Sequence, residues 1–123
     1  MAVKDFRDLS VWQIAIDLAE SVYGLAAHYP KSEVYGLSSQ LQRAAVSVPS
    51  NIAEGHARES TKEFLRFLSV AQGSLAELET QLILSERLKY LERDQLAPLL
   101  EKARELGRML HGLQRALRTK GSG

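Results

Sequence analysis

The sequence predicts an all-α protein, an antiparallel up-and-down four-helix bundle, and three observations lead to this fold class. Apolar residues recur at helical spacing in four separate stretches, and no stretch alternates with the period of two typical of a strand. Capping and turn residues separate the stretches. Helices of about 20 residues span roughly 30 Å, and short connections between helices of equal length favour antiparallel neighbours. We expect one domain over residues 1–123, with helices near 10–28, 33–55, 61–90 and 95–118 and a flexible tail at 119–123.

The first two predicted helices are bounded by capping residues and interrupted by one proline. Ser10 and Gln13 have the spacing of a capping box, and Ser32 is a candidate N-cap for the second helix. Gly55 suits the left-handed position that ends many helices. Pro49 costs around 3 kcal/mol in a helix interior. The apolar phase is the same before and after this proline, which predicts a kink rather than a break.

The third and fourth predicted helices carry the clearest apolar seams. Ser60 and Glu63 form a second capping box at the start of the third helix. The middle of that helix is thin, so a neighbouring backbone can come close to Ala71, Gly73, Ser74 and Ala76. The fourth helix begins near Asp94 and tolerates Pro98 in its first turns. Its heptad seam consists of Ala103, Leu106, Leu110, Leu113 and Leu117.

A polar stripe follows one side of the second helix, beside its apolar face. Its members succeed one another at steps of three or four residues and are Gln40, Arg43, Ser47, Asn51 and Glu54. A solvated helix face is normally rich in Lys and Glu, whereas this stripe has no Lys and mostly short hydrogen-bonding groups. One hypothesis is a ligand or RNA site. The favoured hypothesis is a hydrogen-bonded packing seam between helices or subunits, because burial makes a partner obligatory for each polar group.

The segment around this stripe resembles a known family. Asn51 to Gly55, preceded by Ser47 to Ser50, looks like the signature of the four-helix-bundle proteins encoded in bacterial 23S rRNA intervening sequences. That superfamily includes the accessory variability determinant of diversity-generating retroelements. Further matches are Phe6 to Leu9 with Trp12, Tyr35 to Leu37 with Gln40 and Leu41, and Gly73 to Leu75 with Glu77 to Glu79.

The resemblance runs from about Phe6 to Leu91. It implies a homopentamer without known enzymatic activity, and its usual candidate partners are structured RNA and a reverse transcriptase. The accessory protein of retroelements is strongly basic, and the net charge of +1 in this chain departs from that pattern.

A basic stripe on the fourth helix is the candidate nucleic-acid site. Residues 102–120 contain six Lys or Arg against one acid, Glu105. The stripe lies opposite the leucine seam and consists of Arg104, Arg108, His111, Arg115 and Arg118. One hypothesis is a solvated face that favours the helix C-terminus through its dipole. The other is phosphate recognition, because a guanidinium donates to two oxygens at once. No aromatic residue interleaves with the stripe, so backbone or shape readout is expected.

Composition and motifs exclude several other classes. The chain has no Cys, is 45% hydrophobic and 25% charged, and has no run of the roughly 20 apolar residues that span a bilayer. We expect a cytoplasmic protein without a membrane partner. No His has the Glu-x-x-His spacing of a di-iron bundle, and no nucleophile motif or phosphate loop is present. Glu54 and His56 could in principle bind a metal ion, but the favoured interpretation is a helix terminus with a solvated His. We therefore expect no metal, no cofactor and no enzyme. The remaining alternatives are an RNA-binding or reverse-transcriptase accessory oligomer and a structural oligomeric scaffold for a protein partner.

Overall fold

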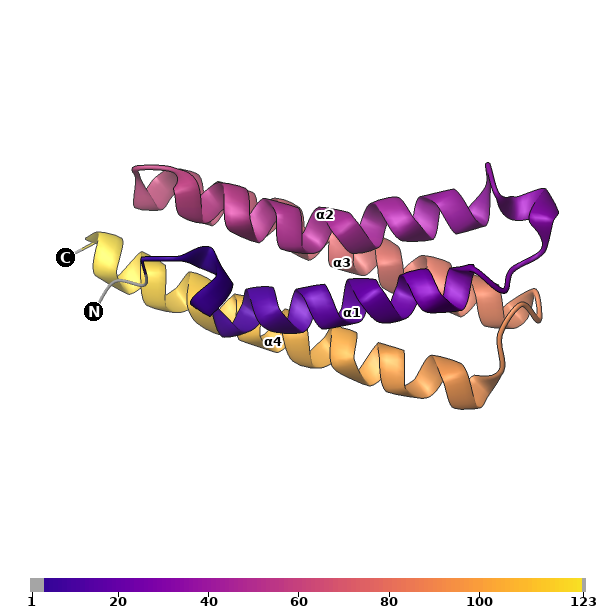
Figure 1. Ribbon diagram of the computed structural model, residues 1–123. Coiled ribbons are helices and arrows are strands. Elements are labelled where there is room, and N and C mark those ends of the chain that lie inside the picture. Colours follow the sequence, from indigo (N-terminus) through magenta and orange to yellow (C-terminus); the bar gives the residue numbers. More distant parts are fainter. Residues whose placement is uncertain (1–3, 123) are drawn as a thin grey trace.

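The computed structural model describes residues 4–122, which form four long helices packed side by side (Figure 1). The helices are α1 (Ser10–Ala26), α2 (Leu37–Ala57), α3 (Thr61–Arg87) and α4 (Arg93–Ser122), and two 3₁₀ turns are η1 (Phe6–Asp8) and η2 (Lys31–Glu33). Each helix packs against the next one in the chain, and α4 packs against α1, whereas the diagonal pairs make no backbone contact. The predicted all-α bundle is confirmed, and no strand occurs among residues 4–122.

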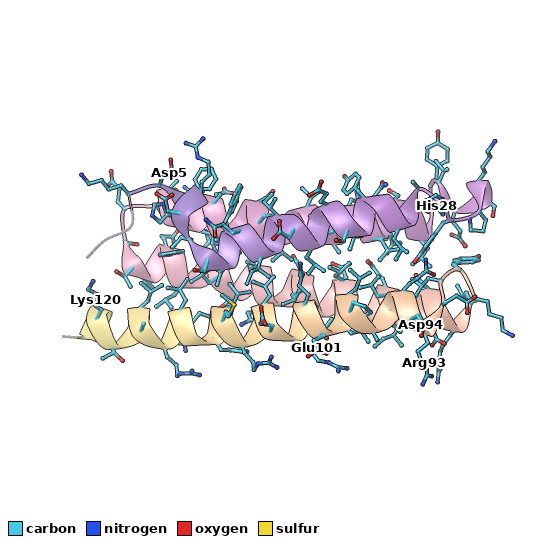
Figure 2. All side chains as sticks on the ribbon, turned by 60° about the horizontal axis from the view of Figure 1, so that its bottom comes forward. Asp5, His28, Arg93, Asp94, Glu101 and Lys120 are labelled. Carbon is cyan, nitrogen blue, oxygen red and sulfur yellow. The ribbon has the colours of Figure 1, made fainter. Side chains whose placement is uncertain are left out.

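Neighbouring helices run in opposite directions. In the α2/α3 pair, Ser47 meets Ser74 and Gln40 meets Gln81, so residue numbers rise on one helix as they fall on the other. Figure 1 shows both chain ends at one end of the bundle. Figure 2 places Lys120 at the end that carries Asp5, and Asp94 at the opposite end with His28. The bundle is therefore up-and-down.

The core is a column of aliphatic side chains contributed by all four helices. Its fully buried large members are Leu18, Leu41, Ile52, Leu68, Leu75, Leu78, Leu82, Leu106, Leu110, Val22 and Val48. In the predicted heptad seam of α4, Ala103 is fully buried too, while Leu113 and Leu117 are only partly covered. Burial of such side chains, at about 1.5–3 kcal/mol each, is the main stabilising contribution.

The starts of α1 and α2 differ from the prediction. Ser10 is the first residue of α1 rather than its cap, and the N-cap is Leu9, whose side chain makes no hydrogen bond to the helix. The Gln13 amide instead donates to the Arg7 carbonyl, at 3.0 Å, because the η1 turn places that oxygen within reach. Ser32 does not cap α2 either, since the η2 turn intervenes and α2 begins only at Leu37.

Glu33 takes the capping role at the start of α2. Its Oε1 accepts from the Leu37 backbone N–H at 2.9 Å, and its Oε2 accepts from the Tyr90 hydroxyl at 2.8 Å. These two hydrogen bonds hold the pKa of Glu33 below its usual range, and the same carboxylate raises the pKa of Tyr90. Tyr90 in turn packs on Tyr29, with ring centroids 5.4 Å apart. One carboxylate thus ties the connection after α1 to the connection after α3.

Of the predictions about helix interiors and helix ends, one is confirmed and three are wrong. As predicted, α2 runs through Pro49 without a break. Gly55 is not a left-handed terminator, because it lies inside α2 and no described glycine has a positive φ. The third helix ends at Arg87, where Lys89 (φ 65°) turns the chain. Residues 119–122 are helical rather than a flexible tail, since α4 continues to Ser122 with basic side chains that suit its C-terminal dipole. Gly123 lies outside the described residues.

Candidate nucleic-acid interface

The basic stripe forms one exposed side of α4, which we name the basic flank. All five of its side chains are exposed, and they are Arg104, Arg108, His111, Arg115 and Arg118. The flank is turned towards α3. Arg104, Arg108 and His111 line a groove between the two helices, together with Gln72, Ala76 and Glu79 of α3. The sequence identified the cationic side of the groove but not its α3 side, because periodicity within one helix does not show which neighbour a flank faces.

Amide side chains fix the groove between α3 and α4. The Gln72 amide donates to the Gly107 carbonyl at 3.2 Å and to Gln114 Oε1 at 3.3 Å. Gln114, which is only 3% exposed, donates in turn to Ser69 Oγ at 3.3 Å. Sequence reasoning missed these residues. The signal that was available is Gln114 on the inward side of a leucine seam, where a polar residue needs a partner.

Glu79 is the single carboxylate among the residues that line this groove. Its Oε1 lies 4.0 Å from Nε of Arg104, at the limit of an ion pair, and the arginine side chain is 63% exposed. Exposed pairs of this kind contribute at most about 1 kcal/mol. Glu79 therefore orients Arg104 weakly and leaves the groove with a net positive charge.

A second side of α4 is acidic. Asp94, Glu101 and Glu105 line a depression with Pro98 and Lys102. At 100° per residue these carboxylates are rotated about the helix axis away from α3. Figure 2 shows Asp94 and Glu101 projecting outwards from the helix. Glu101 also lines a hollow with Arg104 and Arg108, so the acidic side of α4 adjoins the basic flank.

The polar stripe on α2 divides into two groups. Gln40, Ser47 and Asn51 belong to hydrogen bonds along the junction of α2 and α3, which we name the α2/α3 seam. Ser47 Oγ lies 2.7 Å from Ser74 Oγ, and the Asn51 amide donates to Ser47 Oγ at 3.0 Å and to the Ser47 carbonyl at 2.8 Å. The Gln81 amide donates to Gln40 Oε1 at 3.3 Å. Ser47 and Gln40 therefore join α2 to α3, whereas Asn51 supports Ser47 from within α2.

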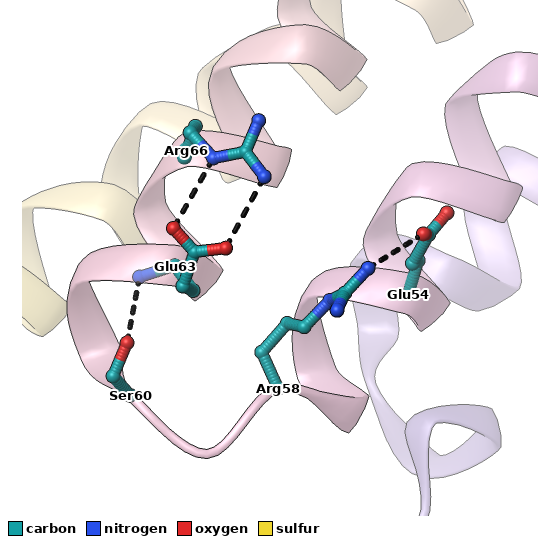
Figure 3. Close-up of polar contacts among 5 residues, drawn as sticks. All are labelled: Glu54, Arg58, Ser60, Glu63 and Arg66. Atoms are coloured by element: carbon teal, nitrogen blue, oxygen red, sulfur yellow. Dashed lines mark hydrogen bonds and ion pairs between the residues drawn. The ribbon is translucent and has the colours of Figure 1, made fainter.

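The two charged members of the stripe, Glu54 and Arg43, make no hydrogen bond to α3 that the structure shows. Glu54 accepts from Arg58, the residue directly after α2, at 2.9 Å, close to the turn where Ser60 caps α3 and Glu63 pairs with Arg66 (Figure 3). Arg43 is exposed and lines a hollow on the seam with Glu77 of α3. Charge at these two positions is accessible rather than buried between helices.

The described part of the chain was expected to hold no metal site, and its His and carboxylate side chains are dispersed. Within residues 4–122, no three His, Cys, Asp or Glu side chains are grouped so that they could hold a metal ion. His56 packs edge-on against Phe64, with ring centroids 5.9 Å apart. None of the described helices is both long and apolar enough to cross a membrane.

Comparison with known proteins supports one family. No curated protein matches the sequence. Among solved structures, the chain is similar to a protein of unknown function from the S23 ribosomal protein family of Bacteroides thetaiotaomicron. The two are 22% identical, with a TM-score of 0.76 over 85% of this chain and 97% of that chain, and at this identity the likeness shows the fold alone. The family model for 23S rRNA-intervening sequence proteins matches residues 7–112, so the chain belongs to that family.

Proposed function

We propose that this protein is a non-catalytic homo-oligomer, a pentamer, that binds structured RNA through the basic flank of α4. The observation that carries the proposal is the placement of four arginines on one exposed side of a single helix, and two of these arginines, Arg104 and Arg108, border a groove. The number five follows from the family resemblance. The bacterial cytoplasm, where ribosomal RNA resides, is the compartment that this function implies.

The chemistry of the flank favours phosphates over bases. A guanidinium donates two parallel hydrogen bonds to a phosphate, and four of the five residues are Arg. No aromatic side chain lines the α3/α4 groove, so unstacked bases have no platform there. We expect binding that depends on the shape and backbone of RNA, with little sequence preference.

Oligomerisation strengthens such binding without new contacts. One flank offers four arginines, and four phosphate contacts give a log–log salt slope of roughly −3 to −4, at about −0.9 per contact. A ring repeats the flank once per subunit, so a folded RNA engages several flanks at once and gains avidity.

Fluorescence anisotropy with a labelled RNA hairpin tests the proposal. The test variant carries Glu at Arg104, Arg108, Arg115 and Arg118, and we expect it to lose binding at 50 mM salt. The matched control carries Glu at Lys31, Lys62, Arg87 and Lys89, which are also exposed, so its net charge is the same. We expect the control to keep most of the affinity. An equal loss of RNA affinity in both variants, or no binding of RNA by the wild type at low salt, would contradict the proposal.

A structural scaffold for a protein partner is the second candidate. It is favoured by exposed apolar side chains at the end of the bundle that carries the Glu33–Tyr90 hydrogen bond. Tyr35 is 98% exposed, and Val34, Leu84 and Leu88 are also uncovered. Exposed apolar groups of this size mark interaction sites more often than scattered surface residues do. A reverse transcriptase is one such partner, and a gene beside a reverse-transcriptase gene would favour this accessory role.

A further inference from the structure

Gln72 is a neutral side chain in the wall of the α3/α4 groove, and its amide is held in one orientation. Its Nε2 donates to the Gly107 carbonyl at 3.2 Å and to Gln114 Oε1 at 3.3 Å. A backbone carbonyl only accepts hydrogen bonds, so the nitrogen of the amide must be the atom that faces Gly107. The oxygen, Gln72 Oε1, is therefore fixed at the other corner of the amide.

Gln72 Oε1 is an acceptor that the chain leaves unused and open to solvent. No described residue donates a hydrogen bond to it. The buried side-chain atoms without a partner in the described chain are Tyr29 Oη and Gln81 Oε1, so Gln72 Oε1 is not a buried atom. Gly107 borders the same groove without a side chain, and a Cβ there would lie 3.8 Å from this oxygen. A ligand in the groove can therefore reach it.

The two hydrogen bonds of Gln72 also set its place along the basic flank. In α4, Gly107 and Gln114 lie on either side of the segment 108–111. The first and last residues of that segment, Arg108 and His111, line the groove together with Gln72. A nucleic-acid strand whose phosphates contact Arg108 therefore passes close to the unused oxygen.

A ribose 2′-hydroxyl is the group of an RNA backbone that fits an acceptor in this place. Phosphate oxygens only accept hydrogen bonds, so they bind the arginines and not Gln72 Oε1. The 2′-hydroxyl both donates and accepts, and it allows a protein to distinguish RNA from DNA. It is present on every nucleotide whatever the base, so a contact to it adds no sequence preference.

We propose that Gln72 Oε1 accepts a hydrogen bond from a ribose 2′-hydroxyl and thereby selects RNA over DNA. This contact rests on the proposed function, because the basic flank must hold the phosphates of the same strand. The arginines of the flank attract any nucleic-acid backbone, whereas Gln72 responds to the sugar. Affinity and the choice of nucleic acid thus come from different helices, α4 and α3.

Glu79 is the carboxylate acceptor of the groove and is less suited to this contact. It lies two helical turns after Gln72, about 10 Å further along α3. Its Oε1 faces Nε of Arg104 at 4.0 Å. Its negative charge also repels the phosphate that adjoins each 2′-hydroxyl. The neutral amide of Gln72 accepts the same hydrogen bond without that repulsion.

Fluorescence anisotropy with two hairpins of one sequence tests the contact. One hairpin is RNA, and the other carries 2′-fluoro groups, which keep the A-form helix and the phosphates but have no hydroxyl proton. We expect the wild type to bind the RNA hairpin roughly two- to tenfold more tightly at low salt, the effect of one neutral hydrogen bond. Gln72→Met removes the acceptor, and we expect this variant to bind both hairpins with equal affinity.

Gln42→Met is the matched control, because Gln42 is a partly exposed glutamine of α2 that does not line the groove. It should keep the preference of the wild type. Gln72 also bridges α3 and α4, but loss of that bridge alone would weaken the binding of both hairpins and leave the ratio of their affinities unchanged.

The outcomes separate this contact from RNA binding itself. Wild-type binding of the 2′-fluoro hairpin as tight as that of the RNA hairpin would overturn the contact and leave the proposed function standing. An undiminished preference for RNA in Gln72→Met would do the same. Binding of neither hairpin by the wild type would overturn the contact and the proposed function together.

Discussion

At the residue scale, Gly55 sets the separation of α2 and α3. A Cβ at this position would lie 2.7 Å from the Phe67 Cβ, 3.0 Å from Phe64 Cδ1 and 3.3 Å from the Phe64 carbonyl oxygen. Two of these three atoms belong to backbone or to the first side-chain carbon, so they cannot move aside without moving α3. The glycine is therefore required by a close approach rather than by a turn.

We expect Gly55→Ala to lower the free energy of unfolding by about 1–3 kcal/mol, the usual cost of an overpacked core. Gly24→Ala is the control, and it should be neutral or stabilise the protein by up to about 1 kcal/mol, because its Cβ has open space. Urea denaturation of both variants measures the difference. A Gly55→Ala variant as stable as the wild type would show that α3 shifts freely.

Glu33 makes part of the stability depend on pH. Its folded pKa lies below the ordinary value of 4.5 because the Leu37 N–H and the Tyr90 hydroxyl donate to the carboxylate. Its contribution is therefore present above pH 4.5 and is lost as the pH falls through the lowered pKa. We expect Glu33→Ala to have a lower melting temperature than the wild type at pH 7. The difference between the two melting temperatures should narrow below pH 4.5. Glu20→Ala, at an exposed position of α1, should show no such narrowing in the same thermal scans, and a constant gap for Glu33→Ala would contradict the assignment.

At the scale of elements, Pro49 opposes the helix that contains it. A proline in a helix interior is about 3 kcal/mol less favourable than alanine. The ring is buried, and it buries about two more methylenes than alanine does, at about 0.8 kcal/mol each. The lost hydrogen bond and strain thus outweigh the packing of the ring.

We therefore expect Pro49→Ala to stabilise the protein by about 1 kcal/mol, measured as a higher urea midpoint. Ser39→Ala, elsewhere on α2, controls for helix propensity and should change stability by no more than about 0.5 kcal/mol. A lower midpoint for Pro49→Ala would mean that the ring packs into a site that alanine cannot fill.

The helix starts show how far local sequence predicts an element. Ser60 was identified correctly, and its Oγ accepts from the Glu63 N–H at 3.1 Å. Ser10 and Ser32 have a similar local pattern, but a 3₁₀ turn precedes or contains each of them and presents another group to the helix. The chain conformation before a helix decides which side chain caps it, and the capping pattern alone does not encode that conformation.

At the scale of the whole molecule, the spacing of apolar residues in the sequence predicts the fold, whereas the sequence predicts only part of the candidate site. Four apolar seams with short connections leave few topologies other than an antiparallel bundle. The basic flank was evident from the spacing of its arginines, but the contribution of α3 to the groove was not. Gln72 and Glu79 lie more than 20 residues away along the chain, and only tertiary packing brings them to Arg104 and Arg108.

Assembly links stability to protein concentration. If the protomers associate, mass action stabilises the folded oligomer, and the thermal midpoint rises with concentration. We expect this rise for the wild type between about 1 and 100 μM. Differential scanning calorimetry over this range is the measurement. A wild-type midpoint that is independent of concentration would contradict an oligomer whose folding and association are coupled.

The closed contact between α4 and α1 makes the order of the helices circular. Each helix packs against two neighbours, and the junction of α4 and α1, the least extensive of the four, is the one without a covalent connection. Because the bundle is up-and-down, the two ends of this junction lie at the same end of the molecule (Figure 1). The position of the chain break is therefore incidental to the packing. A short linker from the end of α4 to the start of α1 would allow the chain to begin instead at the turn after α3, as a circular permutant with the same core.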